Sequence, residues 1–276
     1  MAIVTQLLAA LAMVVVTPIA LRLLDAPGLG ALRRVWPYAA VPGAVALFLP
    51  RGGFAAALAV TYAALTLALA LTAAARLARV PARLTRSRGL IAMDLAACTA
   101  LVAPLGAGVA LVAERAGHEL FGFSLGILAL TVPHLHYAGL AAVLIAGLAA
   151  RAAGNTAAAL SVPAGVGLVF AGFFLGRFVE LAGAVVLTAG LWLAAWLTWR
   201  VVRPRAADRA TRVLLAVSSG ILVVSMPLAL AWAGGRAFDL PHPSVDWMVG
   251  THGVLNALGF ALCAVLAWRR LEADPL

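Results

Sequence analysis

Long apolar runs separated by short polar stretches extend along the whole chain. A membrane-crossing helix needs about 20 apolar residues to cover a hydrocarbon core about 30 Å thick. Because the stretch 157–199 is too long for one span, we divide it at Gly176-Arg177. The pattern then predicts helical spans at 2–23, 35–50, 53–75, 89–113, 123–149, 157–176, 178–199, 213–234 and 247–268. We therefore expect an all-α, polytopic transmembrane bundle of eight to nine spans that forms a single integral membrane domain over residues 1–276.

Two of these runs need a separate interpretation. The run at 35–50 is short and contains Pro37 and Pro42, so we expect a re-entrant or tilted segment there. The run at 2–23 has no positive charge before it and no clear small-residue cleavage site after it. We interpret it as a retained helix rather than a signal peptide.

Composition agrees with a membrane protein and excludes several other classes. Apolar residues make up 64% of the chain and charged residues 11%, against about 45–50% and 25% in soluble domains. This excludes a water-soluble globule, a disordered chain and a disulfide scaffold. The net charge of +10 does not indicate nucleic-acid binding, because that needs a solvated basic face. All 20 basic residues are arginine, so no lysine amine is present to form a Schiff base with a pigment.

The arginines predict an orientation in the membrane. With nine spans and the loop 76–88 in the cytoplasm, 16 of the 20 arginines lie in inner segments and four lie outside: Arg51, Arg115, Arg177 and Arg236. Cytoplasmic loops of membrane proteins carry such an excess. We expect the N-terminus outside, the C-terminus inside, a location in the bacterial cytoplasmic membrane, and contacts between arginines and anionic lipid headgroups.

The fifth span carries the most informative polar group. Its sequence from Pro133 runs Pro-His-Leu-His-Tyr-Ala-Gly, and His134 lies about 17 Å below the outer surface. His134 and Tyr137 are three residues apart and share a helix face, whereas His136 points elsewhere. Pro133 lacks an N–H group and is expected to kink the helix. The alternative is that both histidines are packing residues, each with one neutral hydrogen bond.

The ninth span carries a second group. His252 and Asn256 are four residues apart and share a face, at depths of about 8 Å and 14 Å. Thr251 precedes the histidine, and Gly250 and Gly253 allow a neighbouring helix or a ligand to approach closely. The alternative interpretation is a polar clamp between helices.

Several carboxylates are candidates for the same site. Glu180 either pairs with the nearby Arg177 or reaches the cavity that contains His134 and His252. Asp94, about 8 Å inside the inner face, either pairs with an arginine of the neighbouring loop or is a buried acid. We expect Glu114 to be a solvated loop residue. The stretch Asp239–Pro243 (Asp-Leu-Pro-His-Pro) predicts a rigid turn that could cover the mouth of a cavity.

Acid–base chemistry suits these residue types best. Intramembrane ionisable groups are costly and mark functional sites, and histidine exchanges protons near neutral pH. Metal binding by His134, His252 and Glu180 is a weaker alternative, and the depth difference between the histidines disfavours haem ligation. We expect no cofactor and no metal. The proposed catalytic residues are His134, His252, Glu180 and Asp94, and the proposed substrate-binding residues are His136, Tyr137, Asn256 and Thr251.

The two histidine motifs carry a resemblance to a known family. The stretches Pro133–Gly139 and Thr251–Phe260 resemble the YndJ-like family of bacterial integral membrane proteins. The resemblance implies an all-helical fold of similar size and supports treating His134, His136, Tyr137, His252 and Asn256 as one site, but it implies no particular reaction. We expect an enzyme for isomerisation, cyclisation or ring-opening of a lipophilic small molecule. The alternative is a small-molecule transporter or receptor that uses the same groups.

Overall fold

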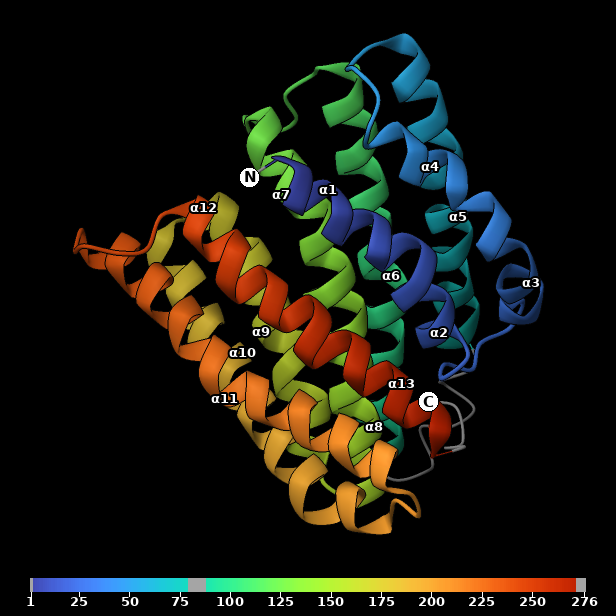
Figure 1. The fold of residues 1–276 in the computed structure, drawn as a ribbon, viewed down its shortest axis with the longest axis vertical. Coiled ribbons are helices and arrows are strands. Elements are labelled where there is room, and N and C mark those ends of the chain that lie inside the picture. The colour runs from blue at the N-terminus through green and yellow to red at the C-terminus, as the bar shows by residue number, and fades with distance from the viewer. Residues whose placement is uncertain (1, 79–87, 272–276) are drawn as a thin grey trace.

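The computed structural model describes residues 2–78 and 88–271, and their regular structure is helical. Within these two ranges no residue belongs to a β-strand, and an isolated bridge joins Leu120 to Phe123. The helices lie side by side in one bundle (Figure 1). This confirms the predicted all-α architecture. Arg79, Arg83 and Arg86, which contribute to the predicted orientation, lie outside the described residues.

The helical elements follow one another with short connections. In chain order they are α1 (Ala2–Leu11), η1 (Ala12–Val16), α2 (Thr17–Leu21), α3 (Leu29–Ala39), α4 (Val41–Ala46), α5 (Gly53–Leu77), α6 (Arg88–Ala116), α7 (Leu125–His134), η3 (Leu135–Ala142), α8 (Val143–Ala153), α9 (Thr156–Leu175), α10 (Arg177–Leu197), η4 (Thr198–Val202), η5 (Arg203–Arg205), α11 (Arg209–Phe238), α12 (Val245–Met248), η6 (Val249–Gly253), η7 (Leu255–Leu262) and α13 (Cys263–Arg270). Several adjacent elements are parts of one continuous helix.

In the described ranges, eight helices are long and apolar enough to cross a membrane. They are Ala2–Leu21, Gly53–Leu77, Gly89–Ala116, Leu125–Ala153, Thr156–Leu175, Arg177–Arg205, Arg209–Phe238 and Val245–Arg270. Each corresponds to a predicted span. The predicted division of 157–199 is also confirmed, because Gly176 separates α9 from α10 with a φ of 112° that favours glycine. The chain is a multi-pass membrane protein.

The predicted span at 35–50 is a broken helix. It consists of α3 and α4, which are separated at Ala40, and Pro42 lies in the first turn of α4. Arg76 at the end of α5 donates to the carbonyl of Asp25, which precedes α3. Arg115 at the end of the antiparallel α6 donates to the carbonyl of Leu49, which follows α4, at 2.9 Å. The α3–α4 pair therefore runs along the length of α5, and the two chain ends lie towards opposite ends of the bundle (Figure 1).

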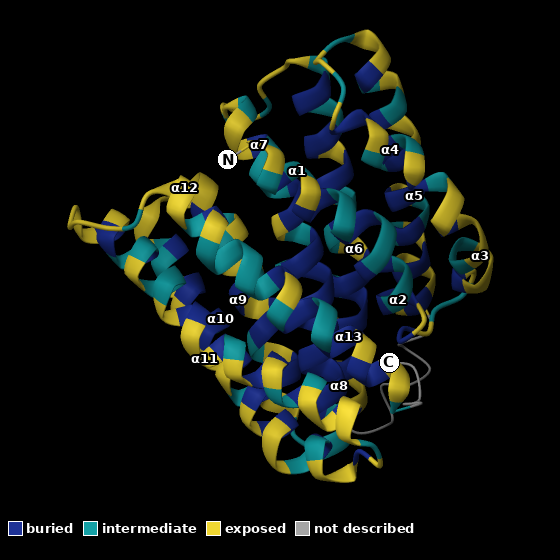
Figure 2. Cartoon of the chain, in the orientation of Figure 1, coloured by how far each residue is buried: buried dark blue, intermediate teal, exposed yellow. Residues whose placement is uncertain are grey.

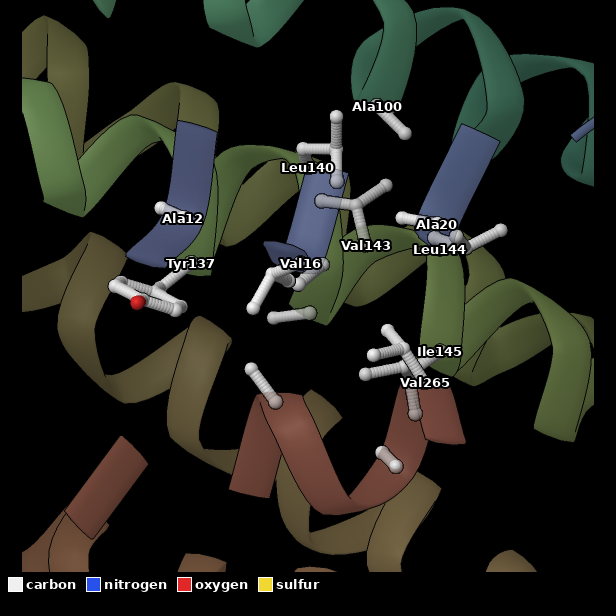
Figure 3. Packing of buried hydrophobic residues seen from close by; sticks show 14 of the residues in the cluster. Ala12, Val16, Ala20, Ala100, Tyr137, Leu140, Val143, Leu144, Ile145 and Val265 are labelled. Atoms are coloured by element: carbon white, nitrogen blue, oxygen red, sulfur yellow. The ribbon is translucent and has the colours of Figure 1, made fainter. Parts of the chain in front are cut away.

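Several spans contain π-helical segments, and three of the spans meet through them. These segments are η1, η3 and the η6–η7 pair, and η3 packs against both η1 and η7. Pro133 lies two residues before the start of η3, and Pro18 is two residues after the end of η1, so each removes a backbone donor near a widened turn. Figure 3 shows Ala12 and Val16 of η1 beside Tyr137 and Leu140 of η3 in the apolar core. The predicted distortion at Pro133 is present as a π-helical segment, a form that is rare and frequent at functional sites.

Burial follows the same arrangement. Figure 2 shows dark, buried residues concentrated in the central helices, among them α6 and α8, while exposed residues cover the outer faces of α3, α4 and α11. The eight residues from Val143 to Ala150 in α8 are all buried. An outer helix face that is apolar and exposed suits contact with lipid rather than with water. The central span that carries His134 thus passes through the middle of the bundle.

Candidate functional site

His134 is the last residue of α7 and lies about 14 Å along the span from Leu125. The residue is exposed at the surface of the helix, although protein atoms surround and desolvate much of its ring. None of the described residues forms a hydrogen bond with this ring. The span that carries His134 meets the span that carries His252 where η3 packs against η7. The two predicted histidines therefore lie on spans that are in contact.

His252 is held by one polar group from α11 and one from the next turn of its own span. Its Nδ1 atom lies 2.9 Å from the carbonyl oxygen of Ser225 in α11, and Nδ2 of Asn256 lies 3.2 Å from both ring nitrogens. The Ser225 hydroxyl in turn donates to Oδ1 of Asn256 at 2.8 Å. These contacts are consistent with a tautomer in which Nδ1–H donates to Ser225 and Nε2 is an acceptor. The predicted proximity of His252 and Asn256 is confirmed, and Ser225 joins the group.

Tyr137 connects this region to the first span. Its hydroxyl donates to the carbonyl of Leu8 in α1 at 2.8 Å. Gly253, next to His252, faces the same leucine: a methyl group at this position would lie 3.7 Å from Cδ1 of Leu8. Helix α1 also packs against both α7 and η6. The first span therefore contacts both histidine-bearing helices, and Tyr137 fixes its position.

His136 lies apart from His134 and is completely buried. Its Nε2 atom is 2.5 Å from the hydroxyl of Tyr62 in α5, and its Nδ1 atom is 2.7 Å from the carbonyl oxygen of Val132. Trp36 packs edge-on against Tyr62 and donates to the carbonyl of Met13 at 2.9 Å. Both ring nitrogens of His136 therefore have partners within the protein. This matches the alternative interpretation of His136 as a packing residue.

Thr251 bonds within its own helix, because its hydroxyl donates to the carbonyl of Trp247 at 2.7 Å. A threonine that donates to the carbonyl four residues earlier has satisfied its hydroxyl hydrogen locally. The threonine lies beside His252 in η6, but the described contacts give its hydroxyl no bond to the histidine pair.

Glu180 lies away from the histidines. It is buried at the start of α10 and pairs with Arg236 of α11, with a separation of 3.3 Å, rather than with Arg177. Helix α9 approaches so closely that a side chain at Gly172 would collide with the backbone of Glu180. Arg177 instead pairs with Asp239 at 2.5 Å. The carboxylate of Glu180 therefore belongs to a separate ionic cluster between α10 and α11.

Asp94 is buried near the opposite end of the bundle and pairs with Arg76 at a distance of 2.8 Å. This agrees with the predicted ion pair to an arginine beside the neighbouring loop. Glu114 differs from its prediction as a solvated loop residue. It is 2% exposed, lies within α6 and pairs with both Arg115 and Arg51, because its carboxylate lies between two arginines.

No curated protein matches the chain, and neither does any solved structure. A family model described as YndJ-like protein matches residues 7–260. The chain belongs to the YndJ-like family. The match includes His134, His252 and Asn256, so the polar groups of this YndJ-like protein lie within the part of the chain that defines the family. It assigns no chemistry to them.

The candidate site of the YndJ-like protein consists of His134, His252, Asn256 and Ser225. Within the described ranges, no three His, Cys, Asp or Glu side chains come together in a way that could hold a metal ion. The alternative of a metal at His134, His252 and Glu180 therefore has no geometric support. Sequence reasoning missed Ser225 and Tyr62, although a buried serine and a tyrosine in the middle of apolar spans are polar groups that need partners.

Proposed function

We propose that this YndJ-like protein is a membrane-embedded enzyme that performs acid–base chemistry on a lipophilic small molecule. The observation that carries the proposal is the ring of His134, which has no hydrogen-bond partner among the described residues and belongs to a span that meets the span of His252 through η3 and η7. Ionisable groups inside a membrane are costly and are retained for function. A histidine without a partner in the described part of the chain is available to a ligand.

The two histidines are suited to different roles. In the tautomer in which Nδ1–H donates to the Ser225 carbonyl, Nε2 of His252 accepts from the Asn256 amide and takes up a substrate proton as a general base once that amide moves aside. His134 is free to change its proton content and can act as the general acid. A base and an acid on one substrate support isomerisation, cyclisation or ring-opening, and none of these requires a redox cofactor.

The neighbouring polar groups position the pair. Asn256 and Ser225 bond to each other and to His252, so we assign to them, rather than to Glu180 and Asp94, the role of orienting the histidine. Those two carboxylates are occupied by Arg236 and Arg76. Tyr137 shapes the site by holding α1 in place. His136 and Thr251 are then supporting residues of the same helices rather than groups that contact substrate.

The protein's surroundings follow from its arginines and its family. We propose the bacterial cytoplasmic membrane, with the N-terminus outside and the arginine-rich end inside. Bonds between Arg205 and Ala152, and between Arg270 and Asp208, group several arginine-bearing segments at one end of the bundle. Cytoplasmic ends of membrane proteins carry such charge. The partners would be a lipophilic substrate and the surrounding lipids.

The test compares variants of the full chain in lipid nanodiscs. The probe is a total lipid extract of the expressing bacterium, and mass spectrometry detects ions that appear or disappear on incubation. We expect a change with the wild type that is lost in His134→Ala and His252→Ala. His118→Ala is the matched control, because His118 is an exposed loop histidine. Equal turnover in all four proteins contradicts the site, and movement of an unaltered compound across vesicles would favour the transporter alternative.

A further inference from the structure

A second polar site lies at the ends of α10 and α11, away from the histidines. A hollow of about 440 Å³ is lined there by Arg177, Gly235, Arg236, Asp239, Leu240 and His242. Asp239 ends α11 with a φ of 53°, in the left-handed region, and the N–H of Leu240 closes the turn on the carbonyl of Gly235 at 2.8 Å. The proline-framed turn that begins at Asp239 therefore forms one wall of this hollow.

The charges around the hollow balance. Arg177 pairs with Asp239 at 2.5 Å, and Arg236 pairs with the buried Glu180 at 3.3 Å. Among the described residues, both arginines form their hydrogen bonds through Nη1, which leaves Nε and Nη2 of each guanidinium with donors for another group. Two cations and two carboxylates make a site with no net charge. Such a site suits a zwitterion better than a simple anion.

The depth of the site matches the lipid headgroup region. Arg177 is the first residue of one span, and Arg236 lies in the last turn of the next. Their guanidinium groups are therefore at the boundary of the hydrocarbon core, where lipid phosphates lie. Phe178 and Phe238 are exposed beside them and pack edge-to-face, and the Arg236 guanidinium lies over the Trp232 ring, 4.7 Å from its centroid. These aromatic rings form an apolar surface next to the hollow.

We propose that this hollow binds the headgroup of phosphatidylethanolamine. The free donors of Arg177 and Arg236 would hold the phosphate, as arginine forks do, and the carboxylate of Asp239 would accept from the ammonium group. The acyl chains would lie against Phe178 and Phe238. The site is separate from the histidine pair, so the proposal does not depend on the proposed enzymatic activity.

The test is native mass spectrometry of the full chain in detergent, titrated in parallel with phosphatidylethanolamine, phosphatidylcholine and phosphatidylglycerol. We expect the wild type to bind phosphatidylethanolamine most tightly, because choline has no N–H donor and phosphatidylglycerol has no cation. Arg177→Gln should weaken this binding about tenfold, as expected for the loss of charge-assisted hydrogen bonds. Asp239→Asn should transfer the preference to phosphatidylglycerol, since the site then carries a net positive charge.

Arg51→Gln is the control, because Arg51 is a half-exposed arginine like Arg177 and is likewise paired with a carboxylate, that of Glu114. It should leave the lipid preference unchanged, as should His134→Ala. An equal affinity for the three lipids in the wild type would overturn the proposal, as would the same loss in Arg51→Gln. Adding inorganic phosphate to the lipid-bound protein tests whether the hollow instead binds a free phosphate ion. Displacement of phosphatidylethanolamine by phosphate would contradict a lipid site, and persistence of the lipid adduct supports it.

Discussion

The Nδ1 atom of His252 lies 2.9 Å from the carbonyl oxygen of Ser225, and this contact joins the last span to α11. The Ser225 side chain is bonded to Asn256 in the same last span. One residue of α11 therefore fixes both the ring of His252 and the amide beside it. This small network sets the orientation of the His252 ring.

The Ser225–Asn256 bond predicts energetic coupling between two spans. Ser225→Ala and Asn256→Leu each remove one partner, so the double variant should be less destabilised than the sum of the single variants. Interhelical hydrogen bonds in membrane proteins give couplings of about 0.6 kcal/mol and at most about 1.7 kcal/mol. A double-mutant cycle of unfolding free energies in micelles measures this coupling. Strictly additive effects would show that the bond does not contribute.

The Tyr62–His136 hydrogen bond predicts that His136 and His134 contribute differently to stability. Tyr62→Phe leaves the buried Nε2 atom of His136 without its partner, which should cost about 1–3 kcal/mol. His134→Phe removes no internal hydrogen bond and should change stability by less than about 0.5 kcal/mol. Unfolding free energies of both variants in the same detergent provide the measurement. A larger loss for His134→Phe would contradict the assignment of His136 to packing and His134 to the site.

Outside the candidate site, we expect substitution of Arg115 to lower the free energy of unfolding most. Its guanidinium group pairs with Glu114 and donates to the carbonyls of Ala46, Leu47 and Leu49. Arg115→Leu leaves Glu114 as a buried carboxylate with a partly exposed partner, Arg51. Breaking a buried pair costs about 3–5 kcal/mol. Arg51→Leu, which removes the half-exposed partner, should cost far less, and equal losses in the two variants would contradict this account.

Much of this fold could be predicted from the sequence because its spans are encoded locally. Runs of about 20 apolar residues identified the eight long spans, and Pro42 marked the break between α3 and α4. The prolines at 18 and 133 also lie next to π-helical segments. Local patterns are sufficient here because the bilayer imposes a length and an apolar composition on each helix.

The partners of the polar groups could not be predicted in the same way. Tyr62 and His136 are 74 residues apart, and Glu180 and Arg236 are 56 residues apart, so their contacts depend on how distant spans pack. Glu180 is only three residues from Arg177, so sequence distance favoured an ion pair with Arg177 over the observed pair with Arg236. The π-helical turns also alter the 3.6-residue periodicity on which face assignments rest. The relative positions of His134 and His252 likewise depend on helix packing.

Asp208 predicts a pH-dependent stability at one end of α11. Hydrogen bonds from the Thr211 side chain and backbone, followed by Arg270, hold the pKa of this carboxyl well below its usual value of 3.8. The ionised form therefore stabilises the folded helix end at neutral pH. This contribution is retained above pH 3.8 and decreases as the pH falls below it. Hydrogen exchange of α11 amides should show faster opening in Asp208→Ala at pH 7, with a smaller difference at lower pH.

The central claim is that His134 and His252 act on one substrate as a unit. Its most direct test is the turnover of the substrate identified in the lipid-extract comparison, measured for His134→Ala, His252→Ala and the double variant in nanodiscs. When two residues act as a unit, removing the second costs little turnover once the first is gone. We therefore expect the double variant to turn over substrate no more slowly than the slower single variant. A double variant whose loss equals the product of the two single losses, or full turnover in either single variant, would contradict this.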